Sequence, residues 1–231
     1  MTPRPERLLA LSGVAFAVLL VVGFLISGGN TPDYAADDQE WMRWAEGNEI
    51  KSRIGAFLVL LAGLAGLHFM ATVRSMWGRV ETTVRGSEQL ARVAFAGGLV
   101  GITGITLAIV MLAGASAEGA DADPTVTRAV ASATLVGPFL VAAMGFAAFL
   151  AAGGLLTLRS EISARWIGIV AILGAGAFSV TFFTLLAGPS EDSVFGYGFP
   201  LGWLALLIWS IATSTARYRE VARRPESGTR R

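Results

Sequence analysis

Six long apolar runs limit what this chain can fold into. Each holds about 19 or more residues with almost no charge, enough for a helix to cross roughly 30 Å of hydrocarbon. Lipid offers the backbone no hydrogen-bond partners, so a spanning segment is a helix or part of a closed barrel. Because the runs lack the alternation of barrel strands, they predict an all-α membrane protein with a six-helix bundle. The runs are 8–28, 54–73, 93–113, 129–158, 166–187 and 198–216.

Composition supports this class. Of 231 residues, 54% are hydrophobic and 15% are charged, whereas soluble proteins carry about 25% charged residues. The chain contains no cysteine, which excludes disulfides and thiolate metal sites, and we expect no cofactor. The first run is longer than the apolar part of a typical signal peptide and no small-residue cleavage motif follows it, so we expect it to stay as a membrane helix.

The basic residues predict how the chain is threaded. With a cytoplasmic N-terminus, fourteen of the 18 basic residues fall on the inner side, which the positive-inside rule favours. The inner ones are Arg4, Arg7, Arg74, Arg79, Arg85, Arg92, Arg159, Arg165, Arg217, Arg219, Arg223, Arg224, Arg230 and Arg231. The outer ones are Arg43, Lys51, Arg53 and Arg128. We therefore expect six crossings of the plasma membrane with both termini in the cytoplasm.

The fourth run, 129–158, is too long for a simple span. At 1.5 Å per residue it would reach roughly 45 Å as a straight helix. Pro138 lacks a backbone N–H, so a kink at this residue is the expected accommodation. The alternative is a re-entrant segment around 135–140, because broken helices line sites in transporters.

Small residues predict how the helices associate, since lipid supplies no hydrophobic force between them. Gly97 and Gly101 form a GxxxG pattern in the third run, and Ala143, Ala147 and Ala151 are spaced by four in the fourth. We interpret both patterns as packing within the chain. A seam between two copies of the chain is the alternative.

The segment between the first two runs is acidic and contains tryptophan. Asp37 and Glu40 fit a capping box, and Gly47 is expected to end the helix. Trp41 and Trp44 fall on one face of the predicted surface helix, 38–46, where they would lie at the level of the lipid headgroups. In the alternative interpretation Trp41, Trp44, Asp37, Asp38 and Glu40 bind an external protein; the acid spacing does not fit an EF-hand calcium loop.

Chemistry-bearing residues are scarce within the runs. His68 is the one ionisable residue deep in a run, and together with Pro138 and Thr181 it marks a possible intramembrane polar site. The simpler interpretation is a histidine hydrogen-bonded locally. No metalloprotease helix motif, phosphate-binding loop or pair of intramembrane carboxylates is present, so we predict that the protein is not an enzyme.

The C-terminal segment, 217–231, is basic and poor in apolar residues. We expect a mobile cytoplasmic tail that contacts anionic lipid headgroups. Its shortness and lack of interleaved aromatic residues argue against nucleic-acid binding.

The acidic loop followed by an Ala-, Gly- and Phe-rich helix resembles a group of uncharacterised actinobacterial multi-pass membrane proteins. The matching residues are Asn48, Arg53, Ala56, Phe57 and Arg74. The resemblance implies the membrane class and no activity. Taken together, these features predict a non-enzymatic membrane component or accessory subunit with the acidic loop as its interaction face. The alternative function is transport or binding of a small neutral or lipid-like solute.

Overall fold

The computed structural model describes residues 9–27, 31–32, 36–81, 87–117, 123–159, 164–183, 186 and 197–223, and over these it contains helices and no strand. The elements are α2 (Ser12–Ser27), α3 (Asp38–Glu81), α4 (Ser87–Ala115), α5 (Pro124–Val136), α6 (Pro138–Arg159), α7 (Arg165–Val180), the 3₁₀ turn η2 (Thr181–Phe183) and α9 (Gly198–Arg223). The all-α prediction is confirmed. Within the described ranges, five helical segments are long and apolar enough to cross a membrane, with α5 and α6 counted as one, and α2 is a shorter apolar helix.

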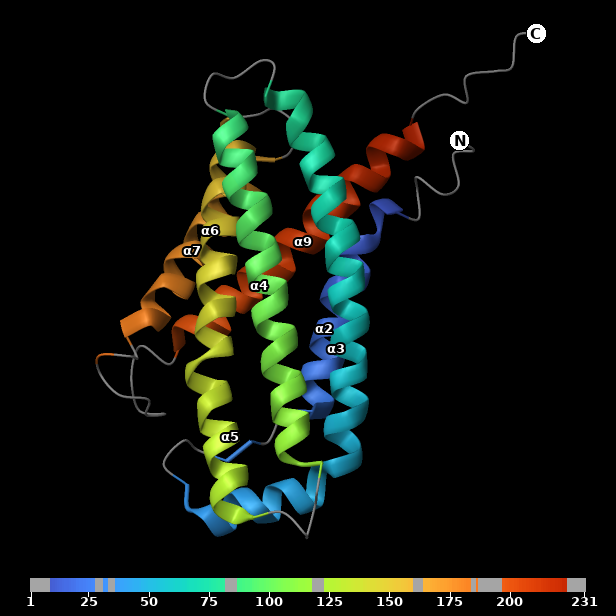
Figure 1. Ribbon diagram of the computed structural model, residues 1–231. Helices are drawn as coiled ribbons and strands as arrows, with labels where there is room; N and C mark the ends of the chain where they lie inside the picture. The colour runs from blue at the N-terminus through green and yellow to red at the C-terminus, as the bar shows by residue number, and fades with distance from the viewer. Residues whose placement is uncertain are drawn as a thin grey trace, which may run out of the picture.

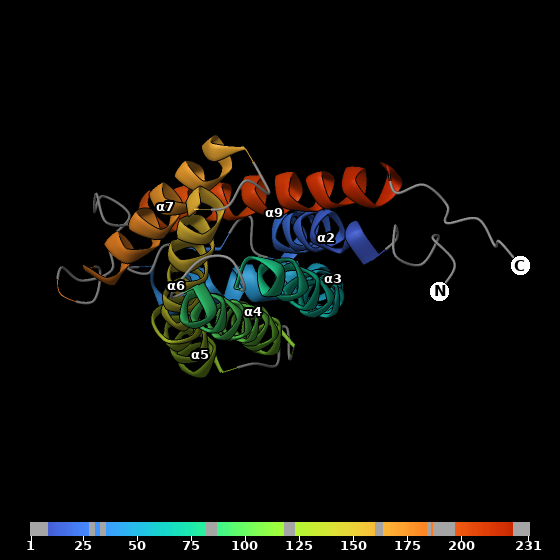
Figure 2. The ribbon, with the colours of Figure 1, turned by 90° about the horizontal axis from the view of Figure 1, so that it is seen from above.

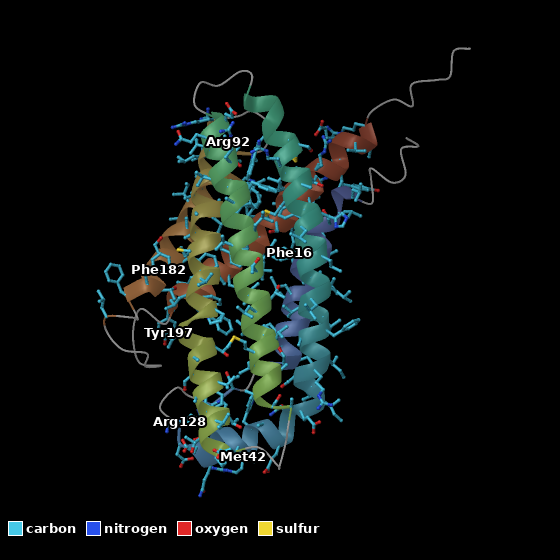
Figure 3. The ribbon with its side chains drawn as sticks, viewed as in Figure 1. Phe16, Met42, Arg92, Arg128, Phe182 and Tyr197 are labelled. Atoms are coloured by element: carbon cyan, nitrogen blue, oxygen red, sulfur yellow. The ribbon has the colours of Figure 1, made fainter. Side chains whose placement is uncertain are left out.

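The helices pack in a closed order (Figures 1 and 2). α2 packs on α3, α3 on α4, α4 on α6, α6 on α7, α7 on α9, and α9 returns to α2. α2 begins and α9 ends at the same end of the molecule, which we call the terminal end. The opposite end, formed by the first turns of α3, the last turns of α4 and α5, is the cap end. Figure 3 shows Arg92 at the terminal end and Arg128 at the cap end.

Glycines bring α4 and α6 into backbone contact. A Cβ atom built on Gly145 would lie 2.2 Å from the Gly101 nitrogen and 2.7 Å from the Gly97 carbonyl oxygen, distances that no real side chain tolerates. Only glycine therefore permits this approach, which maximises van der Waals contact between the helices. The prediction that the GxxxG of Gly97 and Gly101 packs within the chain is confirmed.

α5 and α6 form one long pass interrupted at a single residue. α5 ends at Val136 with Gly137 as its cap, and Pro138 is the first residue of α6. The Gly137 nitrogen still donates to the Ala133 carbonyl at 2.8 Å, so the ladder is broken chiefly by the missing N–H of Pro138. The predicted interruption is confirmed. The re-entrant alternative is wrong, because α5 and α6 follow one another along α4 in one direction (Figure 1).

Aromatic side chains fill the space between the helices as two clusters. The first contains Phe16, Phe69, Trp77, Phe149 and Trp209, and the second contains Phe24, Phe139, Phe146, Phe178, Phe199 and Trp203. Ring centroids within them are 5.0 to 6.5 Å apart, the range in which aromatic pairs attract one another. In the described part of the chain, these rings belong to a packed apolar core.

The outside of the bundle is equally apolar. Leu25, Phe57, Leu173 and Leu201 are each about 60% exposed or more, and many other aliphatic side chains on α2, α3, α7 and α9 are exposed beside them. A soluble monomer rarely exposes so much contiguous apolar surface. The exposure is that expected of helices whose outer faces contact lipid.

Two predicted boundaries are wrong. α3 runs through Gly47 without ending there, since Gly47 does not adopt the positive φ typical of a glycine that ends a helix. Residues 217–223 continue α9 as helix rather than forming a mobile tail, and Val221 within them is 4% exposed. Residues 224–231 lie outside the described ranges, as do residues 8, 28, 184, 185 and 187 at the edges of the predicted runs.

Candidate interaction surface at the cap end

The cap end is organised by the first turns of α3. Asp37 caps this helix, because its Oδ1 accepts a hydrogen bond from the Glu40 backbone N–H at 2.8 Å, which fits the predicted capping interaction. The first turns then run across the cap end before α3 turns to run along the bundle (Figure 1). The Asn48 amide donates to the Trp44 carbonyl at 2.9 Å in this part of the helix.

Both tryptophans face into the protein. Trp41 is fully buried and Trp44 is 7% exposed. Their rings meet edge to face, with centroids 5.7 Å apart. They form a small core, separate from the main one, whose other members are Ala36, Ala45, Leu112 and Ala131. These residues come from α3, α4, α5 and the segment just before α3, so the indoles join these parts of the cap.

This burial corrects the sequence interpretation. The prediction that Trp41 and Trp44 form an exposed aromatic face is wrong, because both indoles are buried inside the protein. The sequence correctly placed both indoles on one helical face. It could not tell which surface that face would meet, because an apolar face packs equally well on lipid or on neighbouring helices.

Polar contacts hold the cap from outside. Arg128 on α5 donates to Asp38 on α3 at 2.9 Å, and the Thr125 hydroxyl donates to the same carboxylate at 3.4 Å. Arg53 pairs with Glu49 at 2.8 Å and also donates to the Ala117 carbonyl just beyond α4. Because these groups are partly exposed, each ion pair contributes at most about 1 kcal/mol. The two indoles add buried apolar area to the cap, while the Trp41 N–H is buried without a hydrogen-bond partner among the described residues.

The start of α5 is a feature that the sequence interpretation missed. Asp123 caps α5 through hydrogen bonds from the backbone N–H groups of Thr125 and Val126, and Pro124 occupies the first helical position. We expected this helix to begin only at residue 129. The Asp-Pro pair carries the signal for an earlier start, since a capping carboxylate followed by proline is typical of a helix N-terminus.

The exposed side of the cap is charged. Asp37, just before α3, and Glu40, Arg43 and Glu46 on its first turns are exposed around the buried indoles. Asp38 is half-buried and bound to Arg128. Met42 and Arg128 mark this end in Figure 3. We name Asp37, Glu40 and Glu46 the acidic cap surface.

The three residues of the possible intramembrane site lie on three different elements. His68 is exposed on the outer side of α3, and its Nδ1 lies 2.9 Å from the Leu64 carbonyl oxygen. Pro138 lies beside Gly104 of α4, whose Cβ position is 3.0 Å from the Pro138 oxygen. Thr181 is buried at the end of α7 against Gly198. His68 lies on the exposed side of α3, apart from the buried Thr181, and a shared polar site of the three residues stays a prediction.

Metal binding at the cap finds no support in the described residues. None of their His, Asp and Glu side chains form a group of three that could hold an ion. Asp33, part of the calcium alternative, lies outside the described ranges.

The helices and the exposed apolar surface are those of a multi-pass membrane protein. Comparisons with protein-family models, with curated proteins and with solved structures give no match for this chain. The function is therefore argued from the chain's own residues.

Proposed function

We propose that the protein is a non-enzymatic, multi-pass component of the plasma membrane that binds a partner protein through the acidic cap surface. One observation carries this proposal: the buried Trp41 and Trp44 give the cap a core of its own, which holds Asp37, Glu40 and Glu46 on a fixed helical surface. A preformed surface loses less conformational entropy on binding than a mobile loop does. The partner would present basic residues to it.

Orientation is part of the same proposal. Arg159, Arg165, Arg217, Arg219 and Arg223 lie at the ends of α6, α7 and α9, and those ends meet at the terminal end (Figure 1). The positive-inside rule places this end in the cytoplasm, where its arginines would contact anionic headgroups. The cap end would then face outward and be accessible to an external partner.

The test is purification in lipid nanodiscs followed by quantitative mass spectrometry of co-purifying proteins. We expect the double variant Glu40→Gln with Glu46→Gln to reduce the recovery of a stoichiometric partner about tenfold, the effect of losing two ion pairs with that partner. Glu88→Gln with Glu220→Gln, which also removes two carboxylates but at the terminal end, is the matched control. Unchanged recovery of every partner by the cap-end double variant would contradict the proposal.

Transport of a small neutral solute is the second candidate. The interruption at Gly137 and Pro138 favours it, because the missing N–H frees a carbonyl in the middle of a pass. The two aromatic clusters oppose it, since they fill the interior along which a solute would move. Flux into liposomes of purified protein, abolished by Thr181→Phe, would support transport over partner binding.

A further inference from the structure

An open apolar groove lies between α3 and α4, away from the cap. Its volume is about 370 Å³, within the range of small-molecule sites. The lining residues are Leu60, Gly63, Leu64, Leu67, Ile102, Thr103, Thr106, Leu107 and Val110. Leu60, Leu64, Leu67 and Leu107 are between 46% and 58% exposed. The groove therefore opens on the outer side of the bundle, where hydrocarbon would meet it.

Glycine creates the hollow. A Cβ atom on Gly63 would lie 3.3 Å from the Thr106 hydroxyl oxygen and 3.8 Å from Ile102. The first contact is tighter than an ordinary van der Waals contact, so a side chain at residue 63 would press on Thr106 and occupy the floor of the groove. From Leu60 to Leu67 the groove extends about 10 Å along the helix, roughly a third of the hydrocarbon thickness.

Polar atoms continue from one end of the groove along the exposed side of α3. His68 follows Leu67, and the hydrogen bond of its Nδ1 to the Leu64 carbonyl holds its ring against the groove wall. A carbonyl only accepts, so this hydrogen bond requires the tautomer with a proton on Nδ1, in which Nε2 is the acceptor. Thr72 and Ser75 donate their hydroxyl protons to the His68 and Thr72 carbonyls. Their oxygens, like His68 Nε2, are left to accept hydrogen bonds.

The hydrogen-bond acceptors beside the groove indicate which kind of ligand it binds. His68 is exposed, and no described residue donates a hydrogen bond to its Nε2. A molecule that complements this nitrogen has an apolar tail and a hydroxyl group. The ester carbonyls of a phospholipid only accept, so they do not complement it.

We propose that the groove binds an uncharged lipid with a free hydroxyl group, its tail along Gly63 and its hydroxyl donating to His68 Nε2. The site is distinct from the acidic cap surface, and neither proposal depends on the other. Monoacylglycerols, diacylglycerols and long-chain alcohols belong to the class of ligand proposed for the groove.

Native mass spectrometry of the full chain in detergent tests the site with two probes, mono-oleoylglycerol and methyl oleate. They share a tail, and only the first has hydroxyl groups. We expect wild-type protein to retain one mono-oleoylglycerol per chain about tenfold better than methyl oleate, the discrimination of one hydrogen bond. His68→Phe should remove this preference, whereas His68→Gln, which keeps an acceptor, should preserve much of it.

Blocking the groove separates specific from general lipid binding. Gly63→Leu fills the hollow and should abolish retention of both probes. Gly176→Leu, at an exposed α7 position where a Cβ meets nothing within 4 Å, is the matched control and should retain them. Equal retention of the two probes by wild type, or retention that survives Gly63→Leu, would overturn the proposal. So would a dimer that Gly63→Leu dissociates, since a second copy would then occupy the groove.

Discussion

Two helix–helix contacts of this bundle, which we call seams, contain small residues. The small residues act in opposite ways in the two seams. Between α4 and α6, Gly97, Gly101 and Gly145 leave no side chain at all, so the two backbones touch. Between α2 and α9, the small residues are largely serines with buried hydroxyls. The first seam gains dispersion contacts without burying any additional polar group. The second buries groups that need partners.

The seam of α2 and α9 leaves polar atoms unsatisfied. The hydroxyls of Ser12 on α2 and of Ser210 and Ser214 on α9 are buried without a hydrogen-bond partner among the described residues. A neighbouring hydroxyl behaves differently, since Thr215 donates to the Ile211 carbonyl one turn back at 2.8 Å. Such a local bond is the usual solution in apolar helices. Small size alone therefore does not make a residue suitable for a tight membrane seam.

Gly145→Ala is expected to have the largest effect, because its Cβ would meet the backbone of α4 rather than a movable side chain. The two helices would have to separate, and we expect a destabilisation of about 3 kcal/mol. Reversible unfolding in mixed micelles measures this change in the free energy of unfolding. Gly176→Ala is the control, where the added methyl meets nothing and a small gain from helix propensity is expected. Equal stability of both variants would show that α4 and α6 are not in backbone contact.

The comparison also indicates what sequence could predict. GxxxG at Gly97 and Gly101 identified a packing face, and that inference needs only helical spacing. It did not identify Gly145 as the partner, because the spacing of one helix says nothing of which neighbour it meets. Pro138 similarly marked the interruption correctly, since a missing N–H acts locally.

The cap was less predictable for a related reason. The capping role of Asp37 follows from neighbouring residues, and it was predicted. The burial of Trp41 and Trp44 depends on Leu112 and Ala131, which come from α4 and α5 far along the chain. His68 shows the same limit, because its place on the exposed side of α3 depends on where α2 and α4 pack.

Gly13→Ala tests the serine seam and should have an intermediate effect. A Cβ on Gly13 would lie 2.2 Å from the Ser214 hydroxyl oxygen and 2.7 Å from the Phe69 ring. These are side-chain atoms that can move, so we expect about 1 to 2 kcal/mol of destabilisation. The double variant Gly13→Ala with Ser214→Ala should recover part of this, because it removes the closest atom. Strict additivity in the same unfolding assay would argue against direct contact.

Ser210→Ala should have the smallest effect and the opposite sign. It removes a buried hydroxyl that has no partner among the described residues, so its desolvation penalty disappears and stability should rise by about 1 kcal/mol. Thr215→Ala, which removes a hydroxyl already bonded to its own helix, should change stability by less than about 0.5 kcal/mol. A loss of stability in Ser210→Ala would mean that the hydroxyl is hydrogen-bonded in the membrane, through water or through a rotated Ser12 or Ser214. The two seams would then differ in geometry alone, with polar groups satisfied in both.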